Sequence, residues 1–150
     1  MSKTRVPFET TLLLRDNCLC LNVQQAARSL GRRFDEALRP FELTNGQFSL
    51  LMSLNRPEPP RLGDVAHLLA MDRTTLTAAL KPLQRRGLAV AKPDPQDKRS
   101  RRIALTATGH DLLLQALPVW RRHHARLEKY LGAVNAGRLR EELQFLTRVS

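Results

Sequence analysis

The sequence predicts a mainly α-helical fold of about six helices with one small antiparallel sheet. Three observations predict it. Apolar residues recur three or four positions apart over most of the 150 residues, as in amphipathic helices. Pro-rich stretches at 57–60 and 93–95 interrupt this period, and the second separates two short apolar segments, 88–92 and 101–105, that suit strands. The length suits one domain.

The first predicted helix extends from about Thr11 to Arg39. Its apolar residues recur at helical spacing: Leu19, Val23, Ala26, Leu30 and Phe34. One helix of a small domain cannot bury so wide a stripe, so the stripe implies a partner surface. A second helix follows the cap residue Thr44 and ends before Pro57. The run 57–60 excludes helix and suits a short edge strand.

The next two predicted helices are separated by a very short turn. A short amphipathic helix begins at Leu62, and a second begins at about Arg73, because Asp72 can accept hydrogen bonds from the unpaired amides of a first turn. Only Ala70 and Met71 lie between the first helix and this cap, which is the spacing of a helix-turn-helix motif. The core face of the second helix comprises Leu76, Ala79, Leu80 and Leu83.

A cationic hairpin is predicted next. Gly87 can end the helix in a left-handed cap, and the strands 88–92 and 101–105 flank a turn rich in Pro and Asp. Helix, turn, helix and hairpin together predict a winged helix-turn-helix. Two further apolar helices, from about Thr106 and about Asn135, complete the chain.

The outer face of the helix that starts at Arg73 suits a DNA groove. It offers short or cationic side chains and no acid before Arg86, so it can enter a major groove, where threonine can bond to phosphates or base edges. We expect DNA contacts from Thr74, Thr77 and Lys81. Arg73 and Arg85 are either phosphate clamps or members of surface ion pairs. The alternative is a solvated helix that happens to be rich in threonine.

The net charge supports a polyanionic partner. The chain carries a formal charge of +11, and residues 72–102 hold nine cationic and three acidic residues. A basic helix beside a basic hairpin is the electrostatic footprint of a nucleic-acid-binding protein. Binding to double-stranded DNA should therefore weaken strongly with salt.

The sequence resembles the MarR family of bacterial transcription regulators. The resemblance rests on three motifs in the family's order and spacing: LKPLQRRGL at 80–88, DPQDKR at 94–99 and LTATG at 105–109. It implies a homodimer in which helices within 11–40 and 106–150 pair, while 44–105 forms the DNA-binding lobe of a single domain at 1–150.

The resemblance also implies how DNA is read. The expected target is a near-palindromic operator with half-sites about 34–36 Å apart, and repression is the family default. Arg99, at the wing tip, should enter the flanking minor groove, with Lys98 and Arg101 as further DNA contacts. Asp97 is expected to position Arg99 or its neighbours, and Arg101 is a candidate for the same network.

Two cysteines suggest what the regulator senses. Cys18 and Cys20 resemble the start of the first helix in the organic-hydroperoxide-sensing branch of the family, with Cys20 at the reactive position. The tyrosines which that branch places in the second helix are absent at 43–48. Residues two apart on a helix face different sides, so an intrahelical disulfide would require unwinding. The alternatives are small buried side chains or thiols that line a ligand pocket.

A second hypothesis for the signal is a small aromatic acid bound between the two lobes, as the resemblance implies. Arg15, Phe48, Met52 and Trp120 are the residues expected to line such a pocket. Aromatic residues at helical spacing are more often core.

Other classes of function find little support. The sequence has no phosphate-binding glycine loop, nucleophile elbow or paired carboxylates, so we expect no enzyme and no cofactor. The adjacent His123 and His124 point about 100° apart on a helix and cannot clamp one metal ion, so no metal site is expected. No segment suits a membrane span or signal peptide, which indicates a cytoplasmic protein. A non-specific nucleic-acid-binding or protein-docking winged-helix module remains the alternative.

Overall fold

The computed structural model describes residues 5–149 and divides the chain into two compact units between Arg33 and Phe34. The elements are α1 (Phe8–Asn17), α2 (Leu19–Leu38), the 3-10 turn η1 (Arg39–Phe41), α3 (Asn45–Leu54), α4 (Leu62–Leu68), α5 (Arg73–Arg85), β1 (Ala89–Pro93), β2 (Arg101–Leu105), α6 (Ala107–Leu131) and α7 (Ala133–Val149). The predicted fold, mainly helical with a small antiparallel sheet, is confirmed.

The first predicted helix is divided in two at Cys18, which raises the number of α-helices in residues 5–149 from about six to seven. Cys18 has an extended backbone (φ −74°, ψ 111°). The Asn17 side chain donates 2.8 Å to the carbonyl of Leu13, and the amide of Cys18 donates 2.9 Å to the carbonyl of Leu14, so the last carbonyls of α1 are paired. Cys18 then begins the next helix, because its carbonyl accepts from the amide of Asn22 at 3.0 Å.

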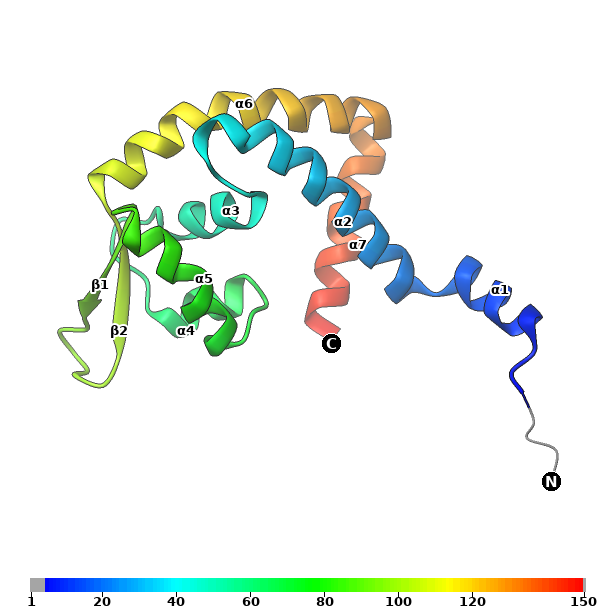
Figure 1. The fold of residues 1–150 in the computed structure, drawn as a ribbon, viewed down its shortest axis with the longest axis horizontal. Coiled ribbons are helices and arrows are strands. Elements are labelled where there is room, and N and C mark those ends of the chain that lie inside the picture. Colours follow the sequence, from blue (N-terminus) through cyan, green and yellow to red (C-terminus); the bar gives the residue numbers. More distant parts are fainter. Residues whose placement is uncertain (1–4, 150) are drawn as a thin grey trace. The chain divides into compact units, whose positions relative to one another are not determined.

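The core of the second unit lies among α3, α4, α5, α6 and the hairpin. In Figure 1, α3 lies between α6 on one side and α4 and α5 on the other. The predicted core face of α5 is largely confirmed, since Leu76, Leu80 and Leu83 are at most 2% exposed. Ala79, the fourth predicted member, is only partly buried and packs against this core. The opposite face of α5 is therefore turned outward by the burial of its leucines.

The wing is an antiparallel pair in which Ala89 lies opposite Leu105 and Pro93 opposite Arg101. The edge strand expected at 57–60 is not formed. Its place is taken by a single bridge between Arg61 and Arg102, and the amide of Ile103 donates 3.1 Å to the carbonyl of Pro60. Proline has no amide proton and cannot complete a ladder, so pairing is confined to this point.

Thr106 fastens the start of α6 to the base of the hairpin. Its hydroxyl donates to the carbonyl of Gly87 at 2.6 Å and accepts from the amide of Gly109 at 3.0 Å. Its own amide donates to the carbonyl of Leu88 at 3.1 Å. A Cβ atom on Gly109 would lie 2.2 Å from that carbonyl oxygen, so only glycine permits this approach. The LTATG motif thus determines where the hairpin joins the start of α6.

Candidate nucleic-acid interface

The turn between α4 and α5 is closed by local hydrogen bonds. Ala70 adopts a left-handed backbone (φ 52°), and the amide of Met71 donates 2.9 Å to the carbonyl of Ala66. Asp72 then caps α5 by accepting from the Thr75 amide and the Thr75 hydroxyl, each at 2.8 Å. These bonds, the amide first, lower the pKa of Asp72. The motif therefore holds α5 at a fixed angle to α4 through short-range contacts.

The side chains predicted to contact DNA from α5 are all exposed: Arg73, Thr74, Thr77, Lys81 and Arg85. The Thr77 hydroxyl donates 2.8 Å to the carbonyl of Arg73, which leaves its oxygen free to accept from outside the helix. The guanidinium of Arg73 leans over Gly63 of α4, where a Cβ atom would lie 2.9 Å from Nη2. Exposed donors and short side chains thus share the outward surface.

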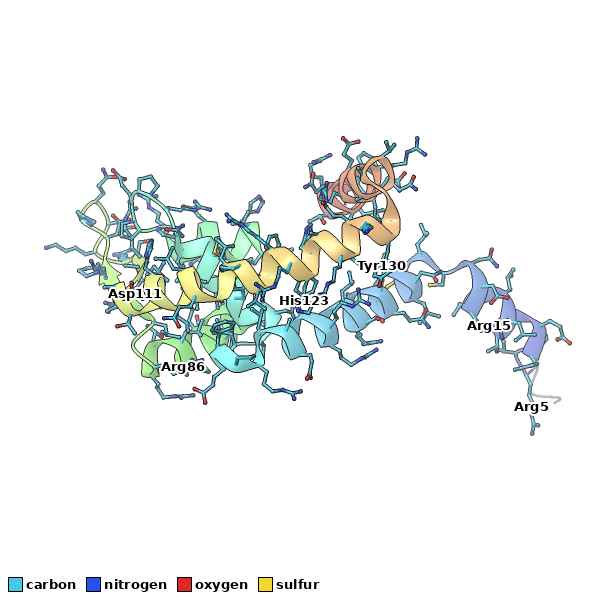
Figure 2. All side chains as sticks on the ribbon, turned by 90° about the horizontal axis from the view of Figure 1, so that it is seen from above. Arg5, Arg15, Arg86, Asp111, His123 and Tyr130 are labelled. Atoms are coloured by element: carbon cyan, nitrogen blue, oxygen red, sulfur yellow. The ribbon has the colours of Figure 1, made fainter. Side chains whose placement is uncertain are left out.

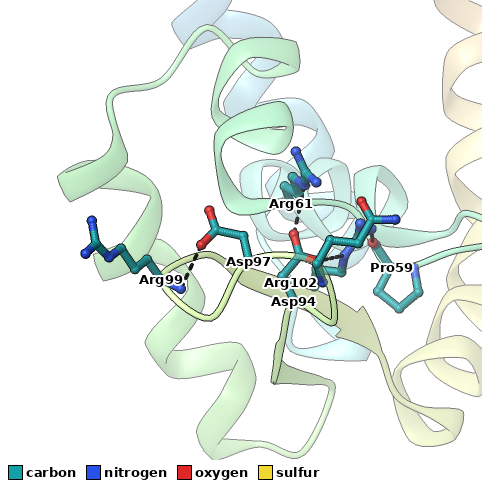
Figure 3. Close-up of polar contacts among 7 residues, drawn as sticks. Pro59, Arg61, Asp94, Asp97, Arg99 and Arg102 are labelled. Carbon is teal, nitrogen blue, oxygen red and sulfur yellow. Dashed lines mark hydrogen bonds and ion pairs between the residues drawn. The ribbon is translucent and has the colours of Figure 1, made fainter.

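The wing tip presents a second cationic group, with Lys98, Arg99 and Arg101 all exposed. Figure 3 shows the Arg99 side chain directed away from Asp97. Asp97 accepts from the backbone amide of Arg99 at 3.0 Å, and its carbonyl accepts from the amide of Ser100 at 3.0 Å. Asp97 therefore shapes the turn through contacts with main-chain amides. Its contact with Arg99 is to the backbone amide and not to the guanidinium.

A buried carboxylate at the wing root was missed by the sequence analysis. Asp94 is 2% exposed, and its carboxylate accepts from Arg61 Nε at 2.9 Å and pairs with Arg102 Nε at 3.3 Å (Figure 3). Arg102 Nη1 also donates 2.7 Å to the carbonyl of Pro59. Arg102, rather than Arg101, thus takes part in the wing's ion-pair network. Because Arg61 precedes α4, this cluster ties the wing to the first helix of the motif.

The charge state of Asp94 is fixed by its surroundings. The amide of Gln96 donates 3.0 Å to the carboxylate, and this bond, with the neighbouring Arg102 and Arg61, lowers the pKa of Asp94. The carboxylate is therefore ionised at neutral pH and holds both arginines. The proximity of Asp94 to the cations of the hairpin was the only available signal in the sequence, because Arg61 lies 33 residues away.

A cavity of about 400 Å³ opens among α3, α4 and α6. Its lining includes Phe48, Met52 and Trp120, three of the residues predicted for a ligand pocket. The rings of Phe48 and Trp120 stack with centroids 6.1 Å apart. The His124 ring stacks on the Trp120 indole with centroids 4.7 Å apart. Arg15 belongs to the other unit, where its Nε donates 2.6 Å to Asp16. The cavity is thus largely apolar, with aromatic rings in its lining.

Both cysteines are free thiols, and each sulfur has a polar neighbour. Cys18 is half-buried at the start of α2, where its Sγ accepts from the amide of Leu21 at 3.4 Å. Cys20 is exposed, and its Sγ accepts from Gln24 Nε2 at 3.2 Å. The exposure of Cys20 in the single chain speaks against a small side chain buried in this chain's own core.

The short helix α4, the tight turn, the capped helix α5 and the hairpin define a winged helix-turn-helix protein. A model of the MarR family matches residues 43–100. The structure of the Mycobacterium tuberculosis transcriptional regulator MosR in complex with DNA is 35% identical, with a TM-score of 0.81 over 89% of this chain and 96% of that one. The chain belongs to the MarR family of DNA-binding transcription regulators.

Other similar proteins include a repressor, an activatory protein and an organic hydroperoxide resistance regulator. The repressor CouR bound to a 23-mer DNA duplex is 27% identical, with a TM-score of 0.79 over 95% of this chain and 99% of that one. The activatory protein BadR of Rhodopseudomonas palustris is 28% identical over 89% of this chain and 77% of its own length. The organic hydroperoxide resistance regulator of Bacillus subtilis is 28% identical over 69% of this chain and 71% of its own.

These relatives are transcription regulators, which confirms the prediction that the chain is not an enzyme. Within residues 5–149, no helix combines the length and apolar character that crossing a membrane requires.

Proposed function

We propose that the chain is a cytoplasmic repressor that binds a near-palindromic operator in double-stranded DNA as a homodimer. The observation that carries the proposal is the outward face of α5, beside a cationic wing. The exposed side chains on this face are short or cationic, and none is acidic. MosR and CouR, which share the fold, have been seen on DNA.

The proposed contacts follow from this surface. Thr74, Thr77 and Lys81 lie in the major groove, while Arg73 and Arg85 hold phosphates. Arg99 enters the adjacent minor groove, and Lys98 and Arg101 approach the phosphates beside it. Two copies related by a two-fold axis would place two α5 helices about 34–36 Å apart, one turn of DNA.

The proposed homodimer is supported by apolar surface that the single chain leaves open. On α7, Leu139, Leu143 and Leu146 are 38–40% exposed and Phe145 is 55% exposed. Leu139, Leu143 and Leu146 recur at helical spacing and form one stripe, and water-exposed stripes of this kind mark association surfaces.

One candidate signal is a small aromatic acid, or its thioester, in the cavity beside Phe48, Met52 and Trp120. CouR has been seen with p-coumaroyl-CoA, a ligand with an aromatic ring. The ligand would act by favouring a dimer whose α5 helices are wrongly spaced for DNA. A coupling free energy of about 1–3 kcal/mol between the two sites would change DNA affinity by roughly 5–150-fold.

The second candidate signal is thiol oxidation, favoured by the exposed sulfur of Cys20 and the amide that Leu21 directs at the sulfur of Cys18. An organic hydroperoxide would convert one thiolate to sulfenic acid and leave as the alcohol. A thiol reductant would then restore the protein.

The test is an anisotropy titration of the intact chain against the DNA beside its own coding sequence, across a salt series, with a shuffled duplex as reference. Lys98→Ala should reduce the log–log salt slope by about 0.9, because Lys98 is proposed to neutralise one phosphate. Arg122→Ala, which removes an exposed cation from α6, is the matched control and should leave the slope unchanged.

Separate arms of the titration identify the signal. Release by hydroperoxide that reductant reverses would support oxidation, and Cys20→Ser and Cys18→Ser would assign the sulfur. Release by an aromatic acid would support the cavity, and Trp120→Ala should abolish it. Equal binding to operator and shuffled DNA would refute the proposal in favour of a non-specific nucleic-acid-binding module, and absence of DNA binding would favour a protein-docking one.

A further inference from the structure

The turn that follows α2 is rigidly joined to the end of that helix. Asp35 Oδ1 accepts from the backbone amide of Asn45 at 2.7 Å and from its side-chain amide at 2.8 Å. The amide of Glu42 donates 2.9 Å to the carbonyl of Arg39, and Leu43 is 3% exposed. The turn 39–45 is therefore held to the end of α2 by hydrogen bonds, and Leu43 within it is fixed by burial.

Glu42 is the strained residue of this turn. Its backbone is left-handed (φ 53°, ψ 39°), a conformation that costs energy for a residue other than glycine. The strain must be held by neighbouring contacts, and the carbonyls of Phe41 and Glu42 point toward the end of α5, where Arg86 meets them.

Arg86, at the end of α5, donates hydrogen bonds to both carbonyls. It is the residue that ends α5, and its Nη1 donates 2.6 Å to the carbonyl of Glu42 while Nη2 donates 3.2 Å to that of Phe41. Figure 2 labels Arg86 where the end of α5 meets this turn. A planar guanidinium can direct two donors at adjacent carbonyls in a fixed geometry, which a lysine cannot reproduce.

We propose that Arg86 is a positioning residue for DNA recognition, which fixes the end of α5 to the end of α2. The connection runs from residues 34–38 through the turn 39–45 to the guanidinium and so to α5. A displacement of the end of α2 would therefore change the direction of the exposed face of α5. The inference rests on the proposed operator binding.

Arg86 differs in this respect from its neighbour Arg85. Both are exposed and cationic, yet two of the Arg86 nitrogens are already engaged by carbonyls 44 and 45 residues earlier. Moving the Arg86 guanidinium to a phosphate would break both bonds and release Glu42. Arg86 should thus affect the orientation of α5, whereas Arg85 should affect the number of phosphate contacts.

The experiment compares the wild-type chain with Arg86→Ala, Arg86→Lys and Arg85→Ala by titration against operator and shuffled duplexes across a salt series. We expect Arg86→Ala to weaken operator binding about tenfold, equivalent to about 1.4 kcal/mol, with little change on shuffled DNA and an unchanged salt slope. Arg86→Lys retains the charge without the fork and should remain weaker than wild type. Arg85→Ala should reduce the slope by about 0.9 on both duplexes.

Amide hydrogen exchange without DNA gives a second readout. Exchange in residues 41–45 and in the last turn of α5 should become faster in Arg86→Ala and stay unchanged in Arg85→Ala. Where Arg86→Ala does not fold, Arg86→Lys carries both measurements.

Three results would overturn the inference: wild-type operator affinity in Arg86→Ala, full recovery in Arg86→Lys, or a salt slope that falls in Arg86→Ala as it does in Arg85→Ala. A wild-type chain without operator preference would instead refute the proposed function, and the inference with it.

Discussion

Helices α5 and α7 belong to the same unit and place leucines at similar spacing, yet they bury them to different extents. Leu76, Leu80 and Leu83 of α5 are at most 2% exposed, whereas Leu139, Leu143 and Leu146 of α7 are 38–40% exposed. Ala136 is the one buried residue of α7. The winged part thus completes its own core, while α7 carries an apolar stripe that the single chain leaves uncovered. That stripe is the surface we assign to the second copy.

The largest expected effect comes from placing a charge on that stripe. Leu143→Asp should dissociate the proposed homodimer, because burying an unpaired charge is unfavourable, and should weaken operator binding by about 100-fold or more as the two half-sites are no longer linked. Sedimentation and anisotropy measure the two effects. Leu143→Lys is the control for charge, since repulsion from DNA would affect only the aspartate variant. A dimer that persists in both variants would remove α7 from the interface.

The second effect is on stability, and it compares glycines on the two helices α6 and α7. Gly109→Ala should lower the free energy of unfolding by about 3 kcal/mol or more, because its Cβ atom would lie 2.2 Å from the carbonyl oxygen of Leu88. Gly137→Ala, where a Cβ atom meets nothing within 4 Å, should be neutral or stabilise α7 by up to about 1 kcal/mol. Urea unfolding measures both, and similar values for the two variants would contradict the close approach.

A smaller effect is expected at the wing root. Asp94→Asn should weaken operator binding by about tenfold, as expected for one misplaced contact, because the wing is no longer fixed to Arg61 and Arg102. Since the folded-state pKa of Asp94 is lowered, its carboxylate adds stability above the unfolded-state pKa, and this is lost as the pH falls through the folded-state pKa. The difference in Tm between wild type and variant should therefore be constant from about pH 5 to 8 and shrink below about pH 4. A difference that persists at low pH would contradict this origin.

The smallest effect compares two threonines. Thr44 caps α3 in a reciprocal pair with Gln47, so Thr44→Ala should cost about 1 kcal/mol. Thr147 of α7 only donates 3.0 Å to the carbonyl of Leu143 in its own helix, and Thr147→Ala should be nearly neutral. Thermal unfolding of the two variants measures the difference, and a larger loss for Thr147→Ala would indicate that α7 is packed more closely than described.

The sequence was sufficient where structure depends on near neighbours. The spacing of Leu76, Leu80 and Leu83 and the cap at Asp72 placed α5, and Gly87 and the Pro-rich turn placed the hairpin. The division at Cys18 was missed because apolar spacing continues across it and no glycine or proline marks the break. The partners of Arg86 and Asp94 lie 44 and 33 residues away, so no local pattern could reveal them.

The Thr106 hydroxyl lies 2.6 Å from the carbonyl oxygen of Gly87, and the Thr106 amide nitrogen lies 3.1 Å from the carbonyl oxygen of Leu88. These two hydrogen bonds close residues 88–105 into a loop. The entropic cost of closing a loop rises only slowly with its length, so these junction contacts do not determine how long the wing must be. Lengthening the segment 95–100 leaves both junction contacts in place, whereas an insertion beside Gly87 or Gly109 breaks them. The wing tip can therefore vary in length without disturbing its junction with α6, and under the proposed function such a change would alter the DNA that flanks the operator contacts.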